Sequence, residues 1–228
     1  MPEVPVYTAA QVQAAEAPLL AAGEPLMLRA SVALARIVLE EISAEQSRVL
    51  VLAGGGNNGG DALFAGAELA AAGVAVDLAL VGRTAHEAGC AAAVAAGARI
   101  VDAATAADGS HDVVVDGVLG IGTQGAPALR GLARDIVTAL LPAVRAGRTR
   151  VIAVDLPSGL HPDEGTTVDD VVLPADVTVT FGGVKAGLVR AEGPSLAGRV
   201  VLVDIGLGPT LSLAAGQGAA TVSRIVAG

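Results

Sequence analysis

Short, continuously apolar runs rich in β-branched residues recur along this chain, and they constrain its fold more than any other feature. Such runs are typical of strands that are buried on both faces of a parallel sheet. The first is RVLVLA at 48–53, which leads into glycines. Similar runs follow at 74–81, 112–118, 150–156, 176–181 and 199–205, with a shorter candidate at 98–101.

Helical stretches of crossover length lie between the early runs, at 60–72, 85–96 and 132–145. Alternating strands and helices predict an α/β fold, a Rossmann-like three-layer α/β/α sandwich with a mainly parallel central sheet. The last two strands have no helix between them, so we expect that end of the sheet to be mixed or antiparallel.

The ends of the chain add two helices and a tail. Thr8 with Gln11 three residues later forms a capping-box pattern for a helix to about Ala22, and Pro25 suits the first turn of a second helix. A length of 228 residues predicts a single domain, 1–228. The residues from about 208 to 228 are rich in Gly, Ala and Ser, which predicts a flexible tail.

Composition excludes several classes of partner. Two Phe, one Tyr and no Trp leave little for stacking on bases, and 14 basic against 23 acidic residues give a net charge of −9. We therefore expect no binding to nucleic acid or to anionic membranes. The longest uncharged run, 205–223, contains glycines, a proline and a glutamine, and the N-terminus shows no secretory signal. The default expectation is a cytoplasmic protein.

A glycine-rich loop, GGGNNGGD at 54–61, follows the first buried strand and precedes a helix. Gly54, Gly56 and Gly59 satisfy the pattern GxGxxG, but a dinucleotide enzyme also needs a carboxylate at the end of its second strand, and Asp77 lies inside that strand instead. A hydride-transferring dehydrogenase is therefore disfavoured. Glycines before a helix still suit an anion. A tight turn without a ligand is the alternative, although two asparagine amides favour a site.

Two aspartates end neighbouring strands. Asp116 follows three valines, and Asp155 ends RVIAVD. Carboxylates at the carboxyl ends of parallel strands face one crevice, where one can act as acid or base while the other orients substrate. Burial would raise the pKa of Asp116 unless hydrogen bonds compensate. The alternative for such an aspartate is a purely structural role, accepting backbone N–H bonds.

Other loop residues are weaker candidates. The loop GIGTQG at 120–125 can wrap a phosphate that Arg130 could reach, and Lys185 between glycines is a candidate partner for a phosphate or carboxamide. Ser158 is not in a GxSxG nucleophile turn, but its hydroxyl suits a hard monovalent cation. His86, His111 and His161 lack metal-ligand spacing and are interpreted as ordinary, mainly surface, histidines.

The segments GGGNNGGDALFAGAELAAAG, VVVDGVLGIG, VIAVDLPSGLHPDEG, VTVTFGGVKAGLV and GRVVLVDIGL occur in an order and spacing that resemble the NAD(P)H-hydrate epimerase family, the YjeF N-terminal domain. The resemblance covers roughly residues 6–207. It implies epimerisation of the R and S forms of hydrated NADH and NADPH, often by a homodimer. It also implies a partner, an ATP- or ADP-dependent dehydratase that is separate or fused.

The resemblance also implies roles for particular residues. Potassium ligands would be Asn58, Asp116 and Ser158, and Asp155 would contact substrate. Two departures stand out: the arginine usual in the second loop is missing, which affects the phosphate contacts, and Leu28 and Ser31 replace common residues of the second helix. The residues implied to line the substrate site are Asn57, Asn58, Gly59, Gly60, Asp61, Gly120, Ile121, Gly122, Thr123, Gln124 and Gly125.

The chemistry of the hydrate fits these residues. Its C6 carries a hydroxyl and is bonded to ring N1, so a general acid can help the hydroxyl leave and N1 stabilises the cation that forms. We assign this acid–base role to Asp116, with Asp155 and Lys185 orienting; the opposite assignment of the aspartates stays open, as does ring opening and reclosure. A competing hypothesis is a non-catalytic nucleotide-binding or protein-interaction module, as in the apolipoprotein A-I-binding protein.

Overall fold

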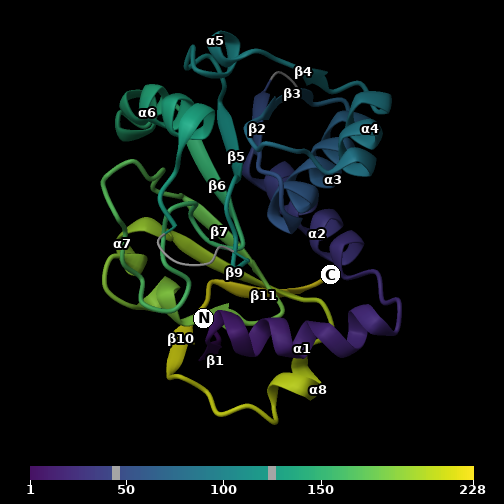
Figure 1. The fold of residues 1–228 in the computed structure, drawn as a ribbon, viewed down its shortest axis with the longest axis vertical. Helices are drawn as coiled ribbons and strands as arrows, with labels where there is room; N and C mark the ends of the chain where they lie inside the picture. Colours follow the sequence, from purple (N-terminus) through teal and green to yellow (C-terminus); the bar gives the residue numbers. More distant parts are fainter. Residues whose placement is uncertain (43–46, 123–126) are drawn as a thin grey trace.

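An eight-stranded sheet forms the centre of the computed structural model, which describes residues 1–42, 47–122 and 127–228 (Figure 1). The strand order is β11-β9-β7-β6-β5-β2-β3-β4, and every neighbouring pair is parallel. The predicted parallel sheet is therefore confirmed. Its strands are β2 (Arg48–Ala53), β3 (Ala75–Leu80), β4 (Arg99–Ile100), β5 (Val113–Gly117), β6 (Arg150–Val154), β7 (Val177–Phe181), β9 (Arg199–Asp204) and β11 (Arg224–Ala227).

Helices cover both faces of this sheet, which gives the three layers expected. Alternate residues of one strand enter different cores: Val49 and Val51 pack with residues of the first four helices, whereas Leu50 and Leu52 pack with the fifth and sixth. The helices are α1 (Ala9–Ala21), α2 (Leu26–Glu41), α3 (Asn57–Ala71), α4 (Glu87–Ala95), α5 (Ala103–Ala106), α6 (Gly131–Arg145), α7 (Gly193–Leu196) and α8 (Gly208–Leu211).

The expectation of a mixed or antiparallel end to the main sheet is wrong. Strands β7 and β9 pair in parallel, with Val179 opposite Val201. The segment between them contains β8 (Val184–Lys185), a 3₁₀ turn (Ala186–Val189) and α7. A parallel crossover needs only about a dozen residues or more to return the chain to the same edge, and this irregular segment supplies them without a long helix.

The two ends of the chain meet in a second, smaller sheet. Strand β1 (Glu3–Tyr7) lies between β8, to which it is parallel, and β10 (Ala219–Thr221), to which it is antiparallel. The structure therefore corrects the flexible tail expected at 208–228: this segment contains α8, β10 and β11, and Val222 is fully buried. These short strands have little signal of their own, and they form because β1 and β9 offer free edges.

Helix α1 begins as predicted. Thr8 accepts a hydrogen bond from the backbone N–H of Gln11, and the Gln11 side chain accepts one from the N–H of Thr8. Two bonds join α1 to distant loops. The backbone N–H of Ala9 donates to the carboxylate of Asp163 at 2.6 Å, and the side chain of Gln13 donates to the carbonyl oxygen of Ile121 at 3.3 Å. These contacts place α1 across the carboxyl end of the main sheet.

Candidate active site

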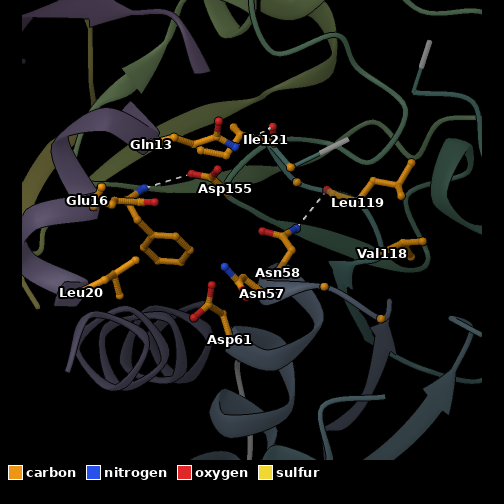
Figure 2. Close-up of a pocket in the computed structure, with 16 residues that line it drawn as sticks. Gln13, Glu16, Leu20, Asn57, Asn58, Asp61, Val118, Leu119, Ile121 and Asp155 are labelled. Atoms are coloured by element: carbon orange, nitrogen blue, oxygen red, sulfur yellow. Dashed lines mark hydrogen bonds between the residues drawn. The ribbon is translucent and has the colours of Figure 1, made fainter. Parts of the chain in front are cut away.

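A cleft of about 520 Å³ opens at the carboxyl ends of β2, β5 and β6, the edge at which parallel α/β sheets bind ligands (Figure 2). Helix α1 forms one wall, and the loops after the strands form the others. The lining residues are Gln13, Glu16, Ala17, Leu20, Gly55, Gly56, Asn57, Asn58, Asp61, Val118, Leu119, Gly120, Ile121, Gly122, Asp155 and Phe181.

The NNGGD segment is the first turn of α3, because the helix begins at Asn57 and not at Gly60 as predicted. This start depends on a close approach of two backbone segments, since a Cβ on Gly59 would lie 2.0 Å from the carbonyl oxygen of Gly54. Of the five residues, Asn57, Asn58 and Asp61 line the cleft. Gly59 and Gly60 pack inward, where Gly60 faces Met27 and His86, so the two glycines shape the turn instead of lining the site.

Asn58 is held by two strand-end carbonyls. Its side-chain nitrogen donates to the carbonyl oxygen of Leu119 at 3.0 Å and to that of Val154 at 2.8 Å. A Cβ on Gly120 would lie 2.9 Å from Asn58 Oδ1, so a glycine at 120 lets the second loop approach this amide. Both N–H groups of the amide therefore point at carbonyl oxygens, and the amide oxygen Oδ1 lies beside Gly120.

Asp116 is buried below the cleft. Its side chain is 1% exposed, and it is absent from the cleft lining. Its two oxygens accept backbone N–H bonds, Oδ2 from Ser158 at 2.9 Å and Oδ1 from Val118 at 3.4 Å. Burial raises the pKa of Asp116, and the bonds from Ser158 and Val118 oppose that rise. A carboxyl so enclosed is poorly placed to exchange a proton with a molecule in the cleft.

The three residues expected to hold potassium do lie together. The hydroxyl of Ser158 accepts a hydrogen bond from the Leu119 N–H at 2.8 Å, and the carbonyl oxygen of Leu119 accepts one from the Asn58 amide. The backbone N–H of Ser158 donates to the carboxylate of Asp116. Their oxygens comprise one carboxylate, one amide and one hydroxyl, a hard set with at most one full negative charge. Among the described residues no group of three or more His, Cys, Asp or Glu could hold a metal ion. The donor set suits a monovalent cation better than a divalent one.

Asp155 enters the cleft from a strained backbone position. Its φ of 69° lies in the left-handed region, which residues other than glycine rarely adopt, and its N–H donates to the carbonyl oxygen of Val179 at 2.7 Å. Its Oδ1 accepts bonds from the Phe181 N–H and the Thr180 hydroxyl, each at 3.2 Å, and from the Lys185 ammonium. Within the described chain none of these bonds uses Oδ2, which leaves that oxygen to a ligand. Strain of this kind clusters at functional sites.

Lys185 lies behind Asp155. Its side chain is 1% exposed and is absent from the cleft lining. Its ammonium donates to Asp155 Oδ1, to the Phe181 carbonyl at 2.9 Å and to the Thr180 hydroxyl at 3.3 Å. The structure therefore does not place it as a direct partner of a phosphate. It orients the Asp155 carboxylate and balances its charge.

Two further acids line the cleft, Glu16 and Asp61, of which only Asp61 was expected from the sequence. Glu16 lies on α1 and was not among the site residues expected from the sequence. The spacing of Gln13, Glu16 and Leu20 places them on one face of a helix, and this pattern could have pointed to Glu16. Burial raises the pKa of Glu16; Lys185 opposes the rise and Asp155 adds to it. Burial also raises the pKa of Asp61 well above its ordinary value, and the carboxyls of Asp155 and Glu16 raise it further.

The other expected site residues, in the second loop and at Arg130, differ in whether they line the cleft. Gly120, Ile121 and Gly122 line the cleft, whereas Arg130 is exposed at the start of α6 and is absent from the lining. Thr123, Gln124 and Gly125 lie outside the described residues.

The histidines are not alike. His86 caps α4, accepting a bond from the Gly89 N–H at 3.1 Å, and His161 accepts bonds from the N–H groups of Asp163 and Glu164. His111 corrects the expectation of an ordinary surface residue: it is 1% exposed and bonds Asp77 at 3.0 Å, at the opposite end of the sheet. His111 precedes β5 and its partner Asp77 lies on β3, so its burial depends on segments that are distant in the sequence.

The cleft thus combines carboxyls in different protonation environments with amide and backbone donors. Such a combination supports general acid–base chemistry on a bound molecule.

None of the helices in the described part of the chain has the length and apolar character of a membrane span.

Comparison with known proteins identifies relatives of this chain. The NAD(P)H-hydrate epimerase of Microbacterium testaceum is 57% identical over 210 residues, which cover 91% of this chain and 81% of that protein. The bifunctional NAD(P)H-hydrate repair enzyme Nnr of Mycobacterium tuberculosis is 40% identical over 210 residues, 88% of this chain and 41% of that protein. The crystal structure of the yeast protein ynu0 shares the fold, with a TM-score of 0.73 at 19% identity over 90% of this chain and 94% of that one.

The model of the family described as YjeF-related protein N-terminus matches residues 23–187. This range contains every loop residue that lines the cleft and leaves out helix α1, which forms one wall. The chain therefore belongs to the YjeF-related protein N-terminus family.

Proposed function

We propose that this protein is an isomerase that interconverts the R and S forms of hydrated NADH and NADPH, in the repair of nicotinamide nucleotides. The observation that carries the proposal is Asp155, a non-glycine residue with a φ of 69° whose carboxylate stands between buried Lys185 and the cleft. The name of the 57%-identical relative, NAD(P)H-hydrate epimerase, supports the same activity. Strained backbone that aims a carboxylate into a cleft is more easily explained by catalysis than by stability.

The mechanism follows from the hemiaminal at C6. A carboxyl group in the cleft gives a proton to the C6 hydroxyl, the C–O bond breaks, and the N1 lone pair forms a double bond to C6 while water departs. Water then adds to the other face of C6 and gives up a proton, and N1 regains its lone pair. No electron leaves or enters the substrate, so the reaction consumes no redox cofactor.

The structure favours Asp155 over Asp116 as the proton-transfer group, the opposite of the assignment made from sequence. Asp155 lines the cleft, whereas Asp116 is enclosed and accepts backbone bonds at both oxygens. Lys185 is then a positioning residue that orients Asp155. We expect the nucleotide phosphates to bind at the start of α3, where Gly55 and Gly56 line the cleft and no side chain caps the helix among the described residues.

Potassium is the cofactor that we propose, held by oxygens of Asn58, Asp116 and Ser158. Their hydrogen bonds through Leu119 already bring the three side chains together. When bound, the ion would supply a fixed positive charge beside the substrate loops. Replacing potassium by tetramethylammonium is expected to lower activity or thermal stability, and EDTA is expected to have no effect. Inhibition by EDTA that magnesium or zinc reverses would contradict the potassium proposal.

The partners we propose follow from the same relatives. A dehydratase dependent on ATP or ADP would consume one epimer, either as a separate protein or in a fusion, as the name of the bifunctional Mycobacterium tuberculosis relative suggests. We also propose a homodimer that acts in the cytoplasm. Sedimentation of the purified protein tests the dimer.

The decisive experiment measures epimerisation directly. Hydrated NADH is prepared as a mixture of epimers, a dehydratase specific for the S form is added, and loss of the R form is followed with and without micromolar protein. Acceleration over the spontaneous rate supports the enzyme. No acceleration would leave the non-catalytic binding module as the better explanation, and binding of the hydrate without turnover would identify it.

A further inference from the structure

Two carboxyl groups reach the cleft from opposite sides. Asp155 stands at the end of β6, and Asp61 projects from the first turns of α3; Figure 2 shows the two side chains across the cavity from each other. Asp155 is 5% exposed and Asp61 is 8% exposed, so both are shielded from bulk water. A flat ring placed between them would present one face to each.

The two groups differ in their partners. Asp155 accepts a bond from the Lys185 ammonium and two more bonds at the same oxygen. Asp61 makes no side-chain hydrogen bond or ion pair within the described part of the chain, and it is one of the residues that line the cavity. A buried carboxyl without a protein partner has its hydrogen-bonding capacity available for a ligand.

Charge around Asp61 favours its protonated form. The charged groups that face it are Glu16 on α1, Asp155 at the end of β6 and Lys185 on β8. Burial raises the pKa of Asp61 most, the two carboxyls raise it further, and only Lys185 lowers it. The cleft therefore pairs a carboxylate held by a cation with a carboxyl whose pKa is raised, and two carboxyl groups in such different environments suit the two roles of acid–base catalysis.

Epimerisation at C6 has a matching requirement. The hydroxyl departs from one face of the ring as water, and water returns to the other face, so a proton must be given on one side and accepted on the other. One carboxyl on one side of a flat ring can serve only one of these steps.

We propose that Asp61 is a second catalytic residue, which transfers the proton on the ring face opposite to Asp155. This inference rests on the proposed function. In one direction Asp61 gives its proton to the C6 hydroxyl, which leaves as water with its bonding electron pair as N1 forms a double bond to C6. Water then adds from the side of Asp155, whose carboxylate takes the proton as N1 regains its lone pair. The reverse direction restores the proton to Asp61. Between turnovers in the same direction, Asp155 gives its proton to water in the cleft and Asp61 takes one from it, and the same exchange supplies the protonated Asp155 that acts on the other epimer.

Oxygen exchange at C6 tests this assignment. In H₂¹⁸O, departure and return of water on the same face incorporate ¹⁸O without epimerisation, and mass spectrometry of the separated epimers reads this out for each form. The wild-type protein is expected to exchange both epimers and to interconvert them.

Asp61→Asn is expected to slow epimerisation by at least about a hundredfold, because a proton-transfer group contributes roughly 10² to 10⁴ in rate. One epimer, whose hydroxyl faces Asp155, is expected to keep most of its oxygen exchange, and the other to lose it. Asp155→Asn should show the opposite preference. Asp135→Asn removes a carboxylate from an exposed position on α6, outside the cleft, and should leave both exchanges unchanged.

The outcomes separate the possible roles. Equal loss of exchange from both epimers in Asp61→Asn, with a raised KM, would show that Asp61 only holds substrate and would overturn the proposal, as would a variant with normal epimerisation. Exchange that persists for one epimer also shows that the variant is folded; if Asp61→Asn does not fold, Asp61→Ser is tested by the same epimer preference. Failure of the proposed function is a different result, since then the wild-type protein itself would accelerate neither reaction.

Discussion

The two ends of the central sheet both bury aspartates, but they surround them differently. At the amino end, Asp77 of β3 accepts bonds from Arg48 at 3.0 Å, from Arg99 at 2.8 Å and from His111 at 3.0 Å. At the carboxyl end, the ammonium of Lys185 pairs with Asp155 and lowers the pKa of Asp61 and Glu16, whereas Asp116 accepts hydrogen bonds from Ser158 and Val118.

The pKa directions follow these surroundings. Burial alone would raise the pKa of Asp77, but the hydrogen bonds from His111, Arg99 and Arg48 prevail and lower it. Burial raises the pKa of Asp61 and Asp116, and no arginine opposes it. The difference teaches that compensated charge at the amino end stabilises the fold, whereas the acids of the carboxyl end other than Asp155 have no ion pair among the described residues, at a cost in stability.

The largest expected effect comes from removing the acid that lines the cleft. Asp155→Asn keeps the size of the side chain but removes its proton-transfer group, so kcat is expected to fall by at least about a hundredfold, or about 2.7 kcal/mol of transition-state stabilisation. Steady-state kinetics on protein shown to be folded by circular dichroism measures the loss. Asp116→Asn is the matched comparison at the buried position: near-normal kcat in Asp155→Asn beside almost none in Asp116→Asn would restore the assignment made from sequence.

The same substitution at the other end of the sheet should affect stability and not catalysis. Asp77→Asn removes a carboxylate that accepts bonds from two arginines and a histidine, and bonds to charged groups contribute roughly 1.5 to 3 kcal/mol, so unfolding free energy is expected to fall by about 2 to 3 kcal/mol. Urea denaturation measures it. Because the native pKa of Asp77 is lowered, its contribution is present above the unfolded pKa and is lost as pH falls through the native value. A stability difference that does not shrink in acid would contradict this account.

Asp61→Asn should have a smaller effect of the opposite sign on stability. The native pKa of Asp61 is raised, so the unfolded chain binds fewer protons at neutral pH and the wild-type protein loses stability as pH rises above the unfolded pKa. An asparagine does not titrate, and Tm is therefore expected to rise at pH 7 relative to the wild type but not near pH 3. Calorimetric melting at both values makes the comparison. A lower Tm for the variant at pH 7 would mean that Asp61 stabilises the fold.

The smallest expected effect concerns Glu16. Its charge helps to raise the pKa of Asp61, so Glu16→Gln should lower that pKa and move the alkaline limb of kcat/KM to lower pH. A pH–rate profile measures the shift. Glu24→Gln is a suitable control, because Glu24 pairs with Arg29 outside the cleft lining. An unshifted limb would show that Glu16 contributes only to the wall.

Local pattern was sufficient for seven strands of the main sheet and for the position of the cleft, but not for β11 or for the parallel pairing of β7 with β9. The run RVLVLA became β2 with the predicted bounds, and Asp116 and Asp155 do end neighbouring strands. Periodicity and apolar content are properties of adjacent residues, so they can be read without knowing what packs against them. Ranking the two aspartates was beyond such a pattern, because both follow a buried strand and only packing shows which one is enclosed.

Contacts between distant segments decided the rest. The α1 wall of the cleft depends on bonds from Ala9 to Asp163 and from Gln13 to Ile121, each spanning more than a hundred residues of chain. Lys185 could not be distinguished from an exposed loop lysine until β8 paired with β1 and buried it.

The sequence by itself determined most strands of the parallel sheet, its helical layers and the loops that carry acids, because hydrophobic periodicity and strand-end position are encoded locally. The tertiary structure alone decided which acids share the cleft, which one a lysine compensates and which one has its pKa raised well above the ordinary value. Those properties depend on burial and on charges from α1, α3, β6 and β8 together, and electrostatic interactions at close range inside a protein are set by distances that no single segment contains.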